Sequence, residues 1–477
     1  MRVRLGIDLA CRADHQASLA DAAGEFMWSA WRFRTTPTDL AVLWDKLPAD
    51  ADVQVIMEPT RNAWAPVAAW LQARGAEVVL VPPERSADLR DYYNKHTKTD
   101  RLDSRILARL PLLHPEGLVA HDGPTPADPF RRATRRRSKL VKARVACWQR
   151  LDALLELLGP GYGAALHTDG YTKTALEVLA RFGDPRDLRR YGQRRLTDLL
   201  VKTSRGKWRD DKAAELAAAA RDAIELWAGG GLDFAELAID IAGEVACARQ
   251  LDTEICALET RIAALFKAAD RRPDNNDDND AGIVASVPCL DGILGAGILA
   301  RFGDFDRFAT LAGVRAFTGL VPKIDQSGNS GGHGGPTKAG DPGLRETLYL
   351  AADHLRRVDP QLAARYHRLI VTEAKHHDSA LCNLAAAVAT RIAACWRRHE
   401  RYVLRDIDGR PITETEGRTI VTERYQIPAD VRAARRRVSR AKQLKQRTGR
   451  RRKESTTAAP ATNPPTTEPS EKVANRP

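Results

Sequence analysis

Two short apolar runs near the N-terminus each end in a carboxylate, and this pattern constrains the fold more than any other feature of the chain. Residues 3–7 lead into Asp8, and residues 53–57 lead into Glu58. A mostly apolar run of five or six residues predicts a buried strand, and open α/β sheets bind their ligands at strand ends. We therefore expect Asp8 and Glu58 to be functional acids at the ends of two buried strands.

A second acidic pair follows these runs. Asp100 and Asp103 are three residues apart, a spacing that places both side chains on one face of a helix. Four carboxylates in a small volume need a counter-charge to stay ionised, and hard oxygen ligands suit Mg²⁺ or Mn²⁺. Together with Asp8 and Glu58, the pair therefore predicts a metal site for phosphodiester cleavage. The alternative for each acid alone is a structural role, as a helix cap, a turn residue or the partner of a nearby arginine.

Length and cysteine content narrow the class of protein. A chain of 477 residues predicts two or three domains with apolar cores. No stretch approaches the ~20 apolar residues of a membrane span and no signal segment is recognisable, so we expect a cytoplasmic, nucleoid-associated protein without membrane contact. The seven cysteines contain no Cys-x-x-Cys pair, which predicts reduced thiols rather than zinc or disulfide frameworks.

The net charge of +13 lies almost entirely near the C-terminus. Twelve lysines or arginines and no acid lie between Arg432 and Lys453, which leaves 63 basic against 62 acidic residues elsewhere. Such a block predicts a disordered basic tail that strengthens phosphate contacts without reading sequence. A merely solubilising tail is the alternative.

The pattern changes along the chain from α/β to helical. Short apolar runs alternate with helical patterns at first, whereas a long amphipathic helix is predicted over residues 131–158, and a heptad-like seam joins Leu251 to Leu265. These helices predict an antiparallel coiled-coil arm, a dimer interface or a packed bundle.

The arginines that open the long helix are candidates for nucleic-acid binding: Arg131, Arg132, Arg135, Arg136 and Arg137. The predicted parts are an α/β catalytic domain (1–120), a helical region with coiled-coil arm and insert (125–270), an acidic linker (271–282), a mostly α-helical domain (283–400), and an extension with the basic tail (401–477).

A glycine-dense loop lies within the helical domain, between residues 319 and 340. It exposes Ser327 and Ser330, and Lys338 and Arg345 follow closely enough to neutralise a phosphate. A loop of this length is usually functional or disordered. A flexible linker is an equal alternative, because spacing assigns no His or Lys partner to either serine.

The acidic residues and the serine loop occur together in an order that resembles a known family. The similar motifs are residues 6–8, 57–60 and 98–108, followed by residues 319–322, 326–328, 337–340 and 344–345. They resemble the DEDD transposases of insertion-sequence family 110, which are relatives of the Piv and MooV DNA recombinases. The similarity covers roughly residues 3–395.

The resemblance implies a RuvC-like, ribonuclease-H-like N-terminal domain and a helical C-terminal transposase domain. It implies that the acids Asp8, Glu58, Asp100 and Asp103 bind Mg²⁺ and that Ser327 attacks the scissile phosphate to form a phosphoserine link to DNA. It further implies a homo-oligomer, a dimer or tetramer, in which the serine of one protomer completes the acidic site of another. A structured guide RNA that pairs with DNA is also implied.

The chain departs from the family pattern near the serine. The usual Pro-Gly-x-Gly is replaced by residues 288–291, the segment after Ser327 lacks its usual basic residues, and the usual Gly-Asn is Gly340-Asp341. Ser330 is therefore a second candidate nucleophile. Two rival functions remain: a RuvC-like junction-resolving nuclease without a covalent intermediate, and a non-catalytic nucleic-acid-binding relative.

Overall fold

A computed structural model of the chain describes residues 1–81, 100–115, 118, 120, 121, 123, 128–166, 170–270, 280–303, 305, 307–327 and 330–434. The chain divides into two compact units, residues 1–128 and residues 129–477. Most of the linker expected at residues 271–282 lies outside the described residues, as does the basic tail after residue 434.

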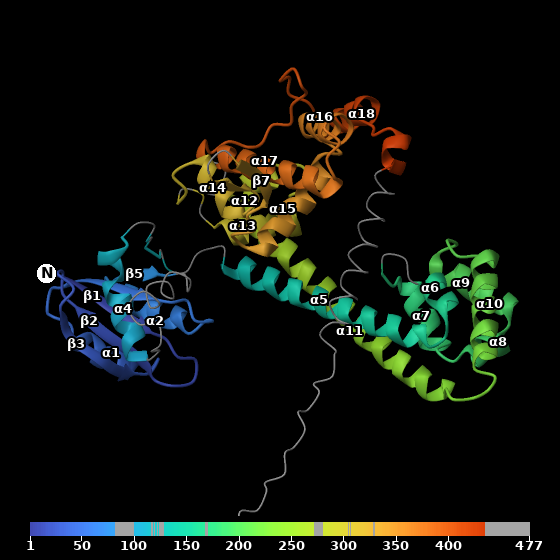
Figure 1. Cartoon of the computed structure of the whole chain (residues 1–477), viewed down its shortest axis with the longest axis horizontal. Helices are drawn as coiled ribbons and strands as arrows, with labels where there is room; N and C mark the ends of the chain where they lie inside the picture. Colours follow the sequence, from blue (N-terminus) through green and yellow to red (C-terminus); the bar gives the residue numbers. More distant parts are fainter. Residues whose placement is uncertain are drawn as a thin grey trace, which may run out of the picture. The chain divides into compact units, whose positions relative to one another are not determined.

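The first unit is built on a mixed five-stranded sheet in the order β3-β2-β1-β4-β5 (Figure 1). Its strands are β1 (Arg2–Asp8), β2 (His15–Ala20), β3 (Phe26–Phe33), β4 (Asp52–Met57) and β5 (Glu77–Leu80). The central strand β1 pairs antiparallel with β2 and parallel with β4. The two apolar runs of the sequence are therefore neighbouring buried strands, and the α/β prediction for this part of the chain is confirmed.

Helices cover both faces of this sheet. They are α1 (Pro37–Asp45), α2 (Trp64–Gln72) and α4 (Asp100–Leu113). Val55 and Met57 of β4 belong to an apolar core with residues of α1 and α2, whereas Ile56 belongs to a second core with residues of α4. Because successive side chains of a strand point to opposite faces, α4 lies on the face opposite α1 and α2.

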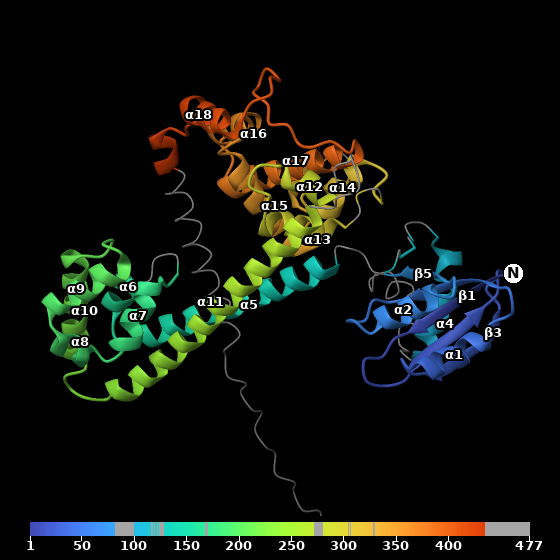
Figure 2. The same cartoon turned by 180° about the vertical axis from the view of Figure 1, so that it is seen from behind.

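Two long helices of the second unit, α5 (Asp128–Glu156) and α11 (Phe234–Asp270), lie side by side in both views (Figures 1 and 2). Ion pairs join them: Arg136–Glu254 at 3.4 Å, and Arg137–Glu259, Arg144–Asp252 and Arg150–Glu244 at 2.6 Å each. The start of α5 meets the later part of α11, so the helices run antiparallel. Of the arrangements left open by the sequence, the structure contains an antiparallel pair within one chain.

The helix pair connects two apolar cores of the second unit. Leu151 of α5 and Ile241 of α11 pack into the core of the insert between them. At the other end, Phe130 and Phe266 pack into the C-terminal core with their ring centroids 6.2 Å apart. The insert consists of α6 (Pro160–Leu166), α7 (Lys173–Arg181), α8 (Pro185–Tyr191), α9 (Gln193–Ser204) and α10 (Asp210–Leu226).

The C-terminal part of the second unit is mostly helical, with one two-stranded hairpin. Its elements are α12 (Asp280–Ala285), α13 (Ile293–Phe302), α14 (Leu311–Thr318), β6 (Pro322–Ser327), β7 (Ser330–Pro336), α15 (Pro342–Leu355), α16 (Pro360–His367), a π-helical turn (Arg368–Thr372), α17 (His377–Arg397) and α18 (Glu414–Arg424). Within the described part of the chain, α17 alone is long and apolar enough to cross a membrane by length and composition. Leu381, Leu384 and Ile392 of this helix are fully buried in the C-terminal core, which accounts for its apolar character.

Candidate active site

Asp8 and Glu58 lie at the same edge of the N-terminal sheet. The parallel register of β1 and β4 pairs Ile7 with Met57, and each acid follows its strand residue directly. Both acids are half-buried. Because parallel strands end at one edge of a sheet, the two carboxylates reach this edge from adjacent strands.

The direction of α4 brings the second acidic pair to the same end. In the later part of α4, Nε of Arg109 donates to the carbonyl oxygen of Gly24, 2.9 Å away, in the turn between β2 and β3. Since β2 runs antiparallel to β1, that turn lies at the end where β1 begins. α4 therefore runs antiparallel to β1, and its first turn, with Asp100 and Asp103, lies where β1 finishes at Asp8.

A glycine in β1 allows α4 to lie directly against the sheet. A Cβ atom at Gly6 would be 2.1 Å from the carbonyl oxygen of Ser104 and 2.4 Å from the backbone nitrogen of Ala108. No side chain fits there without moving the helix backbone. Gly6 thus fixes the depth at which the turn carrying Asp103 approaches the strand that ends in Asp8.

A buried pair of serines also anchors the first turn of α4. The Oγ atoms of Ser18 and Ser104 are 2.8 Å apart, and Ser104 Oγ lies 3.1 Å from the carbonyl oxygen of Arg101, to which it donates. Ser18 then donates to Ser104 and accepts from the backbone N–H of Ala30 at 3.3 Å. The sequence does not reveal the role of these serines, because the two residues that pair are 86 positions apart in the chain.

His15 holds the segment that follows Asp8. Its Nδ1 accepts from the backbone N–H of Ala10 at 3.1 Å, and its Nε2 lies 2.7 Å from Oγ1 of Thr35. Burial lowers the pKa of His15 from its ordinary value, which favours the neutral ring that this acceptor role requires. In the sequence this role is only weakly indicated, by a histidine at the start of a strand.

The donor chemistry at this end of the sheet fits a hard cation, although the described side chains do not enclose one. Asp8, Glu58 and Asp103 are half-buried carboxylates, and each has an interaction within the structure. Among residues with described side chains, no three His, Cys, Asp or Glu residues are close enough to hold a metal ion. The fourth predicted ligand, Asp100, begins α4, and its side chain lies outside the described residues.

The glycine-dense loop forms the hairpin of β6 and β7. Ser327 ends β6 and Ser330 begins β7, and their Cα positions pair in the antiparallel register. The side chains of both serines lie outside the described residues. The structure therefore places both candidate nucleophiles at the tip of a paired hairpin rather than in an unpaired linker.

Two glycines form the base of this hairpin. Gly319 and Gly340 have φ values of 66° and 128°, and a Cβ at either position would lie 2.3 Å from a carbonyl oxygen, that of Ala339 or Phe317. The backbone N–H of Lys338 donates to Gly319 at 3.0 Å. These contacts are possible only without side chains, so they define where the hairpin leaves the helical core.

The predicted nucleic-acid-binding residues differ in their surroundings. Arg136 and Arg137 pair with acids of α11, and Arg131 donates through Nε to the carbonyl oxygen of Ala300 at 2.9 Å. Arg132 and Arg135 are exposed. Lys338 and Arg345 are also exposed or half-exposed beside the hairpin, where Arg345 donates to the carbonyl oxygen of Gly340 at 2.9 Å.

Two departures from the family pattern have visible structural consequences. Cys289, which stands in place of a glycine, has a φ of 66°, a left-handed conformation that favours glycine. Asp341, which stands in place of an asparagine, caps α15 by accepting from the backbone N–H groups of Gly343 at 2.7 Å and Leu344 at 3.0 Å. An aspartate serves as well as an asparagine at this position.

Comparison with known proteins decides the family. One transposase family model matches residues 5–160, and the model described as transposase IS116/IS110/IS902 family matches residues 281–367. The two segments together cover about half of the chain. The chain belongs to the IS116/IS110/IS902 family of transposases. This confirms the resemblance found in the motifs and identifies the protein as a DNA transposase.

Relatives of the transposase cover most of its length. It is 26% identical over 385 residues to the uncharacterized 44.8 kDa protein of insertion element IS116 of Streptomyces clavuligerus. The aligned residues cover 80% of this chain and 92% of that relative. It is 25% identical over 402 residues to the uncharacterized 43.6 kDa protein of insertion element IS110 of Streptomyces coelicolor. Here the aligned residues cover 80% of this chain and 91% of that relative.

The matched segments contain both candidate sites of the transposase. The first includes the four acids, and the second includes both serines of the hairpin together with Lys338 and Arg345. Most of the insert and all of α17 and α18 lie outside both matched segments.

Proposed function

We propose that the transposase cuts and rejoins DNA strands at a divalent-cation site formed by its four N-terminal acids, with Ser327 as the nucleophile. The observation that supports this proposal is the geometry of the sheet end. The parallel pair β1 and β4 and the antiparallel helix α4 bring Asp8, Glu58 and the first turn of α4 to one edge. We propose Ser330 as the alternative nucleophile, since it pairs with Ser327 in the hairpin.

The proposed chemistry is transfer of a phosphodiester to serine. Mg²⁺ or Mn²⁺ bound by the carboxylates would neutralise charge on the phosphoryl oxygens and favour ionisation of a nearby hydroxyl. The Oγ of Ser327 loses its proton to a base and bonds to phosphorus, while the bond from phosphorus to the leaving DNA oxygen breaks and that oxygen is protonated. Because the phosphoserine link conserves the phosphodiester, a DNA hydroxyl can later displace the serine and rejoin the strand.

We propose a RuvC-like, ribonuclease-H-like fold for the first unit. Three antiparallel strands followed by the parallel strands β4 and β5 support this assignment, as do helices on both faces of the sheet. In this fold, the edge of the sheet where Asp8 and Glu58 lie is the place where metal-dependent nucleases of this class bind their catalytic ions. We propose the five parts inferred from the sequence as the functional division of the transposase.

Exposed cations on α5 and beside the serine hairpin support a DNA-binding role. Arg132, Arg135, Lys338 and Arg345 retain accessible surface for phosphates. The ion pairs of Arg136 and Arg137 with α11 give these two residues a role in holding the helix pair as well. We further propose that the active species is a dimer or tetramer and that a structured RNA directs it, both as the resemblance implies.

Covalent capture of DNA tests the nucleophile. Purified transposase is incubated with end-labelled DNA carrying the element ends and Mg²⁺, and adducts are resolved under denaturing conditions. The proposal predicts an adduct that Ser327→Ala and Asp8→Asn each abolish and that Ser330→Ala retains. An adduct lost only in Ser330→Ala moves the nucleophile to Ser330. Strand cleavage that persists in the double serine variant, without an adduct, would instead identify a hydrolytic nuclease.

Mixing two inactive variants tests the oligomer. If the acids of one protomer act with the serine of another, Asp8→Asn and Ser327→Ala proteins regain adduct formation when co-expressed. Failure of the mixture, with each variant still assembling normally, contradicts shared sites.

Sequencing of the RNA that copurifies with the full-length transposase tests whether an RNA directs the reaction. A discrete RNA encoded beside the gene supports RNA guidance, and a random population of RNAs contradicts it.

A further inference from the structure

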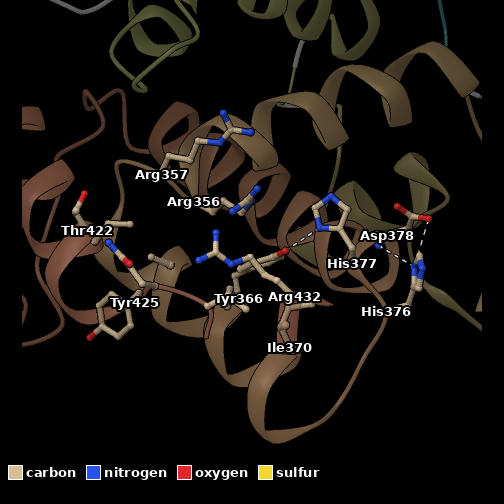
Figure 3. A pocket seen from close by; sticks show the side chains of 14 residues that line it. Arg356, Arg357, Tyr366, Ile370, His376, His377, Asp378, Thr422, Tyr425 and Arg432 are labelled. Atoms are coloured by element: carbon tan, nitrogen blue, oxygen red, sulfur yellow. Dashed lines mark hydrogen bonds and ion pairs between the residues drawn. The ribbon is translucent and has the colours of Figure 1, made fainter. Parts of the chain in front are cut away.

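A cavity of about 870 Å³ lies in the C-terminal part of the second unit, away from the serine hairpin in the chain. Its wall is formed by the end of α15, by α16, by the start of α17 and by α18 with the segment that follows it. In the close-up, Thr422 and Tyr425 lie on one side and His376 and His377 on the other, with Arg356 between them (Figure 3). A volume of this size lies within the range of roughly 300–1,000 Å³ found for small-ligand sites.

The cavity carries a surplus of positive charge. Arg356 and Arg357 share one carboxylate, that of Asp353, at 2.6 and 2.5 Å, so one carboxylate meets two guanidinium groups. Arg432 also lines the cavity, is exposed, and has no side-chain partner in the described part of the chain. An acid is present as well: Asp378 accepts from the hydroxyl of Tyr349 at 2.9 Å. The arginines therefore favour an anionic ligand, and among the described residues no carboxylate pairs with Arg432.

The start of α17 adds to this preference. His376 caps this 21-residue helix, with its Nδ1 3.3 Å from the backbone N–H of Asp378. The positive end of a helix dipole attracts anions, phosphates above all. This end of α17 contributes its first residues, including His376 and His377, to the cavity wall.

The cavity also offers aromatic and polar contacts suited to a nucleobase. Tyr425 lines the wall and is held by an edge contact with His367, whose ring centroid is 6.2 Å away. Nδ1 of His377 lies 2.7 Å from the hydroxyl of Tyr366. Burial, followed by the charge of Arg356, lowers the pKa of His377, which favours the neutral ring. When Nδ1 accepts from Tyr366, the ring proton lies on Nε2, which becomes a hydrogen-bond donor.

We propose that this cavity binds one unstacked nucleotide of a single-stranded nucleic acid, with its phosphate at Arg432 and Arg356 and its base against Tyr425. Proteins that bind single strands combine a basic groove with aromatic rings on which bases stack. A base within a duplex is paired and stacked on both sides, so it cannot enter such a cavity. The proposal does not depend on the metal or on the serine. It adds a further place at which the transposase holds nucleic acid, apart from the cations proposed above.

Binding of short oligonucleotides to the full-length transposase tests this site. The probes are fluorescein-labelled oligo(dT), oligo(U) and a duplex of equal length, and affinity is measured by anisotropy at one fixed salt concentration. Tyr425→Ala should weaken single-strand binding by about 5- to 100-fold, the loss expected for one stacked base. Tyr425→Phe keeps the ring and should bind like the unmodified protein.

A matched pair of arginine variants separates the cavity from general charge. Arg432→Ala should weaken single-strand binding several-fold. Arg418→Ala removes the same charge from the exposed surface of α18, where this arginine pairs with Glu414 and does not line the cavity, and it should change affinity by less than about twofold. Arg432 is exposed, so its replacement does not threaten the fold.

Each outcome decides the proposal. Loss confined to the single strands in Tyr425→Ala and Arg432→Ala supports it. A larger loss with oligo(dT) or with oligo(U) identifies the strand as DNA or RNA, and an equal loss means that the sugar is not read. Equal losses with duplex, equal effects of Arg418→Ala and Arg432→Ala, or unchanged affinity in both cavity variants would each overturn it.

Discussion

The backbone of Gly6 in β1 lies directly against the backbone of Ser104 in α4, so that a Cβ atom at Gly6 would be 2.1 Å from the Ser104 carbonyl oxygen. This contact sets the distance between the central strand and the helix that carries the second acidic pair. Asp8 follows Gly6 by two residues, and Asp103 precedes Ser104 by one. The geometry of the candidate metal site therefore depends on the absence of one side chain.

Replacement of Gly6 by alanine should displace α4 and disrupt the site. We expect a loss of about 3 kcal/mol in the free energy of unfolding, since an added methyl group has no room against backbone atoms. Strand cleavage should be lost in any folded fraction. Chemical denaturation and the adduct assay measure the two effects. The control is Gly243→Ala in α11, where a Cβ meets nothing within 4 Å and helix propensity predicts a gain of about 0.5–1 kcal/mol. A loss at Gly6 no larger than the change at Gly243 would contradict the close approach.

The buried pair of Ser18 and Ser104 should behave as one unit. Either single alanine variant leaves a buried hydroxyl without its partner, and we expect a loss of about 1–3 kcal/mol from each. The double variant removes both hydroxyls, so its loss should be smaller than the sum of the single losses by about 1 kcal/mol. A double-mutant cycle by denaturation measures this coupling. Strict additivity would show that the two hydroxyls do not interact.

Restoring glycine at position 289 should stabilise the transposase. Cys289 has a φ of 66°, a conformation that costs most residues roughly 1 kcal/mol more than it costs glycine. We expect Cys289→Gly to raise the free energy of unfolding by about 1 kcal/mol. The same replacement at exposed Cys256 within α11 should lower the free energy of unfolding by roughly 0.3 kcal/mol, because glycine disfavours the helical conformation. Changes of the same sign at both positions would contradict a strained backbone at Cys289.

Stability should fall in mild acid partly because of His377. Burial, with a further contribution from Arg356, lowers the pKa of His377 in the folded protein below its ordinary value of 6.5. As the pH falls below 6.5, the unfolded chain takes up this proton first, so the folded state loses stability until the pH passes below the folded pKa. His377→Gln should flatten this part of the curve of unfolding free energy against pH. Parallel curves for the two proteins would show that His377 does not titrate differently on folding.

The sequence was sufficient to predict two neighbouring strands of the sheet, β1 and β4, each with an acid directly after it. The runs that end at Asp8 and Glu58 are local patterns, so they can be recognised without knowledge of the fold. Because each run is apolar throughout a buried strand, the acid that follows it lies at the end of that strand. The spacing of Asp100 and Asp103 likewise predicted a helix, which begins at Asp100. The family followed from motifs, because these short segments are similar as sequences.

Contacts between distant elements were not predictable in this way. The pairing of Ser18 with Ser104 and the role of Gly6 depend on how α4 lies on the sheet, which no local pattern contains. The arginines that open α5 resembled a nucleic-acid-binding row, yet Arg136 and Arg137 meet acids more than a hundred residues away in sequence. Charge patterns along a helix do not reveal whether another helix of the same chain supplies the counter-charge.

Manganese binding tests the central claim most directly, because it reports on the acids without requiring the serine, the DNA or an RNA. Free Mn²⁺ is measured by electron paramagnetic resonance during titration of the full-length transposase. The account predicts a saturable site that Asp8→Asn, Glu58→Gln and Asp103→Asn each weaken, whereas Asp14→Asn, which removes an acid that pairs with Arg34, leaves it unchanged. Equal Mn²⁺ binding in all four variants and in the unmodified protein would contradict a shared cation site at the end of the sheet.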